Sequence, residues 1–141
     1  YSFGHYAPDM IGDFLEVHVV SNHGVTSTPL QMSAEHMLYV EYRGFIPASA
    51  LKRGDTLMHI TGSELIVVSV RKAVKARGVY APFTPSGTLV VNGIMVSSFV
   101  AMLDTSEISS SILLSMGGVE LTHQWIAHAF EFPHRVVCHY L

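Results

Sequence analysis

The sequence predicts an all-β domain, and three observations lead to that prediction. Short segments rich in Val, Ser and Thr are separated by turn residues, with 11 Gly and 6 Pro in the chain. The 141 residues are 49% hydrophobic, which is enough for one domain with a buried core. The chain shows no heptad pattern, internal repeat or low-complexity tract that would indicate a different architecture.

The first elements are expected between residues 14 and 40. Residues 14–20 are β-branched and roughly alternating, and residues 21–24 are a turn signal. The chain then returns in a predicted strand over 25–30. Ser33 is expected to cap a short helical turn before a strand that ends at Val40.

The middle of the chain is predicted to add a short helix and two strands. The helix or turn covers residues 48–55 and closes at Gly54. The strands cover 56–60 and 64–71, on either side of a turn at 61–63.

A charge-free stretch over residues 79–103 is long enough to cross a bilayer. Turn residues divide it into short pieces, which a lipid-exposed helix would not tolerate. These residues are Pro82, Pro85, Gly87, Asn92 and Gly93. We therefore predict buried strands over 89–91 and 95–102, joined by the Asn-Gly hairpin signal at 92–93, and no transmembrane segment.

The last part of the chain shows a different pattern, which predicts a short helical C-terminal tail. Residues 109–114 are compatible with a helix, Gly117–Gly118 break it, and 121–128 are compatible with a second helix. We therefore divide the chain into a core over 1–105 and an extension over 106–141.

Composition excludes several classes of function. A net charge of −3 without basic clusters argues against nucleic-acid binding, because neutralising phosphates needs a basic surface. Cys138 is the single cysteine, so neither a disulfide framework nor a Cys-rich zinc module is expected. The histidines of the last segment have spacings that place no i, i+4 pair on a helical face, and we predict no metal and no cofactor. They are His123, His128, His134 and His139.

Ser33 and His36 form the most informative polar pair. A hydroxyl and an imidazole three residues apart can lie on the same side of one helical turn and face a scissile amide. The hydroxyl can bond the peptide group, and the imidazole can protonate a departing nitrogen near neutral pH. By spacing alone, the competing interpretation is that Ser33 is only an N-cap and His36 an ordinary histidine.

The surrounding sequence resembles the Hint domain of hedgehog autoprocessing regions over most of the chain. The segments that carry the resemblance occur in the family's order. They are residues 28–40 (Thr-Pro-Leu-Gln-Met-Ser-Ala-Glu-His-Met-Leu-Tyr-Val), 46–55 (Ile-Pro-Ala-Ser-Ala-Leu-Lys-Arg-Gly-Asp), 78–92 (Gly-Val-Tyr-Ala-Pro-Phe-Thr-Pro-Ser-Gly-Thr-Leu-Val-Val-Asn), 95–100 (Met-Val-Ser-Ser-Phe-Val) and 125–130 (Trp-Ile-Ala-His-Ala-Phe). The third segment is specific to the hedgehog branch rather than to inteins.

The resemblance implies an all-β, pseudo-twofold Hint fold and a self-cleavage reaction. An N-terminal Cys attacks the preceding carbonyl in an N-to-S acyl shift, and a sterol or water then resolves the thioester. The partners would be the chain's own N-terminal flanking polypeptide and, as in hedgehog, a sterol. A location in the secretory pathway would follow, although no signal peptide is visible.

The resemblance also assigns roles to four residues. His36 falls on the histidine that assists collapse of the scissile amide, and Ser33 falls where the family usually has a hydroxyl-bearing Thr. His5 falls where animal hedgehogs carry an Asp tied to the sterol step and many relatives carry His. Ser98 falls where hedgehogs carry a Cys, so no disulfide with the nucleophile is possible, and it is the weakest candidate.

The family's opening motif, which begins with the nucleophilic Cys, has no counterpart in the sequence. Cys138 lies near the opposite end and does not match that position. We therefore expect an N-terminally truncated Hint domain, whose intact form is a single-turnover self-cleaving enzyme. The alternative is a degenerate, non-catalytic Hint-fold interaction module.

Overall fold

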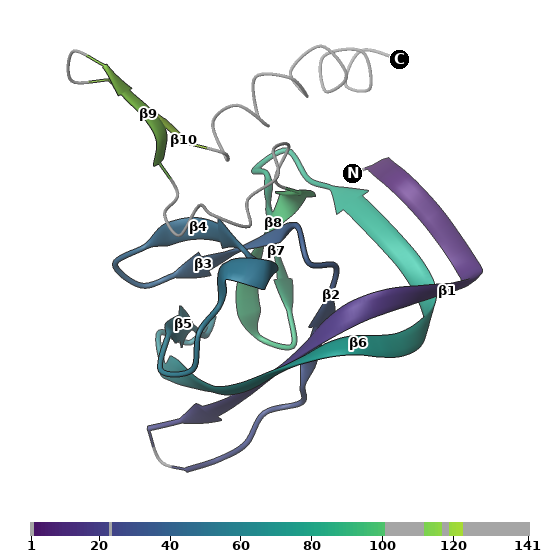
Figure 1. Ribbon diagram of the computed structural model, residues 1–141, viewed down its shortest axis with the longest axis horizontal. Coiled ribbons are helices and arrows are strands. Elements are labelled where there is room, and N and C mark those ends of the chain that lie inside the picture. The colour runs from purple at the N-terminus through teal and green to yellow at the C-terminus, as the bar shows by residue number, and fades with distance from the viewer. Residues whose placement is uncertain (1, 23, 101–111, 117–118, 123–141) are drawn as a thin grey trace.

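The computed structural model describes residues 2–22, 24–100, 112–116 and 119–122, with side chains over 5–22 and 24–100. Strands dominate these ranges (Figure 1). In chain order the elements are β1 (Ser2–Ser21), β2 (Leu30–Met32), β3 (His36–Val40), β4 (Gly44–Pro47), the 3-10 turn η1 (Ala48–Ala50), β5 (Thr56–Met58), β6 (Glu64–Phe83), β7 (Thr88–Val91), β8 (Ile94–Val100), β9 (Ile112–Met116) and β10 (Val119–Thr122). The predicted all-β class is confirmed.

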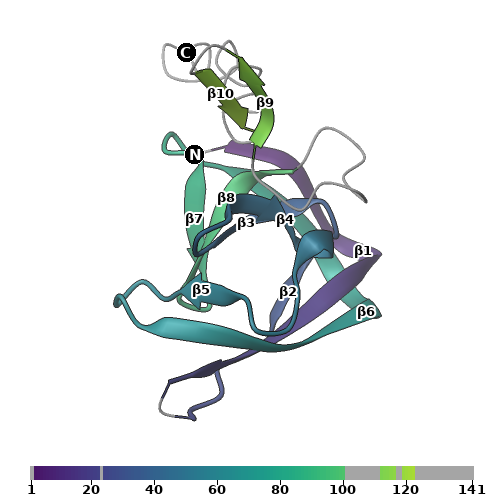
Figure 2. The same ribbon diagram turned by 60° about the vertical axis from the view of Figure 1, so that its left-hand side comes forward.

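The first eight strands form one antiparallel sheet that curls into a barrel-like ring (Figure 2). Its hydrogen-bonded order is β2-β1-β6-β5-β3-β8-β7, with β4 paired to β3. The side-chain Nδ2 of Asn92, just after β7, donates to the carbonyl of Pro29, just before β2, at 3.1 Å. This bond links the two ends of the strand order, so the ring is nearly closed.

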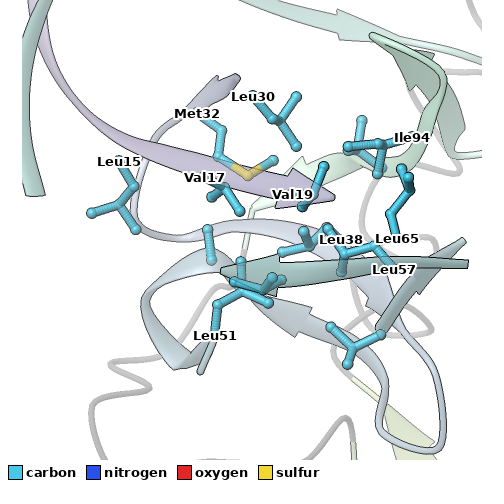
Figure 3. Close-up of a cluster of buried hydrophobic side chains, with 14 of the residues drawn as sticks. Leu15, Val17, Val19, Leu30, Met32, Leu38, Leu51, Leu57, Leu65 and Ile94 are labelled. Carbon is cyan, nitrogen blue, oxygen red and sulfur yellow. The ribbon is translucent and has the colours of Figure 1, made fainter. Parts of the chain in front are cut away.

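The core fills the inside of this ring. In β1, Leu15, Val17 and Val19 are buried while the residues between them are partly exposed, which confirms the alternation predicted for residues 14–20. Facing strands contribute buried residues to the same cluster (Figure 3). They include Leu30, Met32, Leu38, Leu57, Leu65 and Ile94. Each fully buried side chain of this size contributes about 1.5–3 kcal/mol to folding.

β1 and β6 are much longer than the predicted strands over 14–20 and 64–71. They pair from Ser2 opposite Phe83 to Ser21 opposite Leu65. Shifts in the register bend this ribbon, one where Gly78 has φ +92° and another where Ala73 has φ +57°. The bend brings the start of β1 to the end of the ring that holds β8 (Figures 1 and 2).

One further prediction for the N-terminal half, the segment that follows the first turn, needs correction. The turn at 21–24 is present, with the Gly24 amide bonded to the Ser21 carbonyl at 2.8 Å. The chain does return antiparallel to β1, but the bounds predicted for the returning strand are wrong: residues 25–29 pair with β1 only at the single bridge between Val20 and Thr26, and the continuous strand is Leu30–Met32. Residues 25–29 offer little apolar surface to the core, and Val25 remains 66% exposed.

The helix or turn expected over 48–55 is only the short turn η1. The chain leaves the helical conformation at Leu51, whose ψ is 142° and whose side chain is buried. Burial of this leucine in the core therefore overrides continuation of the helix.

In its described residues, 79–100, the charge-free stretch is confirmed as strands joined by a loop over 84–87 and a turn at 92–93, while residues 101–103 lie outside the description. The hairpin at 92–93 has φ +51° at Asn92 and +80° at Gly93, the left-handed pair that a two-residue type I′ turn requires. No helix in the described residues is long and apolar enough to span a membrane.

The tail differs from its prediction where the structure describes it. Residues 112–116 form β9 and pair with β10, so a helix over 109–114 is wrong there. Short apolar runs do not distinguish a strand from a helix by period alone. Residues 123–128 and the boundary at 105–106 lie outside the described residues, and the division into 1–105 and 106–141 stays a prediction.

Candidate active site

The segment from Ser33 to His36 forms one hydrogen-bonded turn between β2 and β3. The His36 amide donates to the Ser33 carbonyl at 3.2 Å. The carbonyl of Ala34, inside the turn, accepts the Ser49 amide at 2.8 Å, which ties the turn to η1. The predicted helical turn is therefore a tight turn, because His36 already belongs to a strand. Both side chains are partly exposed.

The His36 ring is oriented by a bond to the neighbouring strand. Its Nε2 atom lies 2.7 Å from the backbone carbonyl oxygen of Ser97 in β8. A carbonyl can only accept, so Nε2 carries the proton of this bond. In the neutral ring, Nδ1 is then the unprotonated nitrogen.

Burial determines the charge of this histidine. Desolvation lowers the pKa of His36 below its ordinary value of 6.5, and the bond to the Ser97 carbonyl opposes that change. The imidazole is therefore mainly neutral at pH 7, with Nδ1 as its unprotonated nitrogen.

The strand that faces His36 is irregular. His36 pairs with Val100 and Leu38 with Val96, so three residues of β8 lie opposite Met37 alone. Within this bulge the Ser97 hydroxyl accepts the Phe99 amide at 2.9 Å. The same hydroxyl lies 3.4 Å from the Gly87 carbonyl, to which it donates. Ser97 itself is fully buried.

Ser98 joins β8 to the end of β6. Its hydroxyl accepts the Thr84 amide at 3.3 Å and lies 3.0 Å from the Thr84 hydroxyl. The Thr84 hydroxyl donates its proton to the Thr88 carbonyl at 2.8 Å, so Ser98 is the donor to Thr84. This arrangement favours the reading of Ser98 as a small, structurally bonded residue rather than a reacting group.

His5 lies in the bent first part of β1, opposite Ala81 of β6, and its side chain is exposed. Two contacts relate this part of β1 to the strand beside His36. The backbone of Ser2 pairs with Phe83, and the Phe83 ring lies 5.9 Å from the Phe99 ring in β8. The bend in the ribbon therefore brings the first residues of β1 toward the β8 bulge.

The signal for Ser97 in the sequence was its place in a serine doublet within an apolar strand. The sequence did not indicate that its carbonyl binds the histidine, nor that Thr84 binds Ser98. Within the part of the chain that the structure describes, no three His, Cys, Asp or Glu side chains are grouped to hold a metal ion. Cys138 and the four C-terminal histidines lie outside it.

A curled antiparallel sheet with a strand-borne histidine at one end is compatible with a self-processing β domain. The profile of the Hint module family matches residues 2–140, nearly the whole chain. The chain therefore belongs to the Hint family.

Two further comparisons complete this result. A solved structure, that of the VidaL intein (selenomethionine variant), is similar at 14% identity and a TM-score of 0.48. The match covers 67% of this chain and 61% of the intein chain, so this chain spans about three fifths of the intein's length. No curated protein matches.

Proposed function

We propose that the chain takes part in hedgehog-type autoprocessing at a Cys that precedes it in the precursor. The Cys sulfur attacks the carbonyl carbon of the residue before it, the C–S bond forms, and the C–N bond breaks. The released amine takes a proton. A second nucleophile, a sterol hydroxyl or water, then replaces the sulfur and separates the two parts of the precursor.

The observation that carries the proposal is the orientation of His36. Its Nε2 proton is engaged by the Ser97 carbonyl, so Nδ1 is the nitrogen left for the reaction. A neutral imidazole takes the proton of the thiol at Nδ1 and returns it to the departing nitrogen. The lowered pKa of His36 favours the second of these transfers, because the partly buried imidazolium readily donates its proton to the departing nitrogen.

The other predicted residues have supporting roles in this proposal. The Ser33 hydroxyl, at the far end of the same turn, hydrogen-bonds the scissile peptide group. His5 acts as the base for the second nucleophile. Because animal hedgehogs have an Asp at this position, the second nucleophile of this chain is either a sterol or water. Ser98 holds the end of β6 against β8 through Thr84.

The experiment is thiol-induced cleavage of a fusion protein. A Cys-led first block from a Hint domain, preceded by a reporter domain, is joined to residue 1. Dithiothreitol should release the reporter from the wild-type fusion, and His36→Ala should abolish the release. His18→Gln is the matched control, since His18 lies in β1 bonded to Glu16 and should cleave like wild type. A folded fusion that stays intact would contradict the proposal.

The non-catalytic module remains the second candidate because of one sequence feature. The only cysteine of the chain is Cys138, which does not match the position of the family's nucleophile. The same fusion experiment distinguishes the two candidates, because a degenerate scaffold would fold without cleaving when the cysteine is supplied.

A further inference from the structure

We propose that Ser97 is a positioning residue for His36, whose buried hydroxyl holds β8 in the bulge that presents the Ser97 carbonyl to Nε2 of the histidine. This inference rests on the proposed function and deepens it, because it names what orients the reacting imidazole. Ser97 acts through His36 and is not itself a catalytic residue.

The first support is the geometry of the bulge. In a regular antiparallel pair, the residues opposite His36 and Leu38 would be two apart in β8, whereas here Val96 and Val100 are four apart. The two extra residues displace the local backbone from the ladder. The Ser97 carbonyl is thereby turned toward the His36 side chain in β3, and its oxygen lies 2.7 Å from Nε2.

The second support is the way the Ser97 hydroxyl bonds within the bulge. It accepts the amide of Phe99, two residues further along, and donates to the carbonyl of Gly87 in the preceding loop. A serine that bonds backbone two residues away offers the chain a local alternative to the ladder. The side chain is fully buried, so water does not replace these bonds.

The third support is that Gly87 connects both serines of the doublet. Its carbonyl accepts the Ser98 amide at 2.8 Å as well as the Ser97 hydroxyl. Ser98 is therefore a neighbour of the same residue type that shares the loop, but its hydroxyl bonds Thr84 whereas the Ser97 hydroxyl bonds the Phe99 amide inside the bulge, and the carbonyl that meets His36 belongs to Ser97. This difference provides a matched control.

The test is nitrogen NMR of the histidine rings in the 141-residue chain, with Ser97→Ala, Ser97→Thr and Ser98→Ala variants. The wild-type chain should show His36 as the pure Nε2–H tautomer at neutral pH. Ser97→Ala should give a mixture of tautomers and a lower titration midpoint for His36, since the carbonyl bond is what raises its pKa. Ser97→Thr should restore the wild-type tautomer, and Ser98→Ala should leave the His36 signals unchanged.

A wild-type His36 that carries its proton on Nδ1 would overturn the proposal, even if every variant failed to fold. An unchanged His36 spectrum in folded Ser97→Ala would also overturn it. These readouts do not depend on cleavage. Failure of the fusion protein to cleave, with the predicted spectra, would therefore count against the proposed function and not against the role of Ser97.

Discussion

The Nε2 atom of His36 and the carbonyl oxygen of Ser97 are 2.7 Å apart although the two residues are 61 positions apart in the chain. The bond joins β3 to β8 at the point where β8 leaves the regular ladder. It determines which nitrogen of the imidazole is protonated, and this choice decides which atom of the histidine can react.

The burial of His36 predicts a dependence of stability on pH. The pKa of His36 is lower in the folded chain than its ordinary value of 6.5. Below pH 6.5 the unfolded chain therefore binds more protons than the folded one. As the pH falls from 6.5 to the folded pKa of His36, the free energy of unfolding decreases. Urea unfolding at a series of pH values measures this decrease.

His36→Gln is the control for this dependence, because glutamine keeps an N–H donor but does not titrate. The variant should lose the His36 part of the decrease, so its curve should be flatter than the wild-type curve just below pH 6.5. Parallel curves for the two proteins would show that burial of His36 does not affect stability.

Glu16 predicts a second loss of stability at lower pH. Side-chain bonds from Gln31 and His18, together with the charge of Arg71, lower the pKa of Glu16 below 4.5. Its contribution to stability is complete above that value and is lost as the pH falls through the folded pKa. Glu16→Gln should remove this lower step, and an unchanged acid limb would contradict the assignment.

Ala73 predicts a stabilising substitution. Its φ of +57° is a left-handed conformation that costs an L residue roughly 1–2 kcal/mol. Ala73→Gly should therefore raise the free energy of unfolding by about 1 kcal/mol, after allowance for the greater entropy of unfolded glycine. Ala76→Gly, in the same strand without this strain, should lower it by roughly 0.5–1 kcal/mol. The opposite order in thermal denaturation would contradict the strain at Ala73.

An added side chain at Gly93 is expected to destabilise the fold, and the residue that it would meet is His59. A Cβ at Gly93 would lie 2.0 Å from Nε2 of His59, and its φ of +80° disfavours any side chain. Gly93→Ala should cost roughly 1–2 kcal/mol from backbone strain, with a smaller addition from displacing the His59 ring, whose bond to Thr61 is exposed. In the double variant with His59→Ala the clash is removed and the backbone strain stays, so the two changes should be non-additive in urea unfolding. Strict additivity would exclude the clash.

Replacing Arg43 in the Arg43–Asp55 ion pair is expected to lower stability, by an amount that depends on whether the new side chain can bond as the guanidinium does. Arg43 binds the Asp55 carboxylate at 2.6 Å and the Ala50 carbonyl at 3.1 Å, and both side chains are mostly buried. Arg43→Met should cost about 2–3 kcal/mol because it leaves a buried carboxylate without its cation. Arg43→Lys should recover only part of this, since lysine lacks the fork. Equal stability of all three proteins would contradict the prediction.

The sequence predicted those features that depend on neighbouring residues. The Asn-Gly turn requires two positive φ angles, and Asn92 and Gly93 are the residue types that adopt them. The burial of Leu15 and Val17 follows from simple alternation along one strand. In both cases the physical preference lies within a few residues.

Features that depend on distant pairing were not predictable. The length of β1 and β6 depends on pairing between residues more than 40 positions apart. The bend at Ala73 was not predictable either, because alanine is not a residue type that indicates a positive φ. The partner of His36 depends on a bulge in a strand 61 residues away. A motif therefore indicated the histidine, but only the fold identified the group that orients it.

The most direct test of autoprocessing is the mass of the fragment released from the Cys-led fusion by dithiothreitol. Attack of the thiol on a thioester should leave the fragment with dithiothreitol attached to the residue before the cysteine, and His36→Ala should yield none of it. A fragment of that mass in the wild-type fusion alone is the predicted result. Its absence from a folded wild-type fusion, or equal amounts from His36→Ala, would contradict the account.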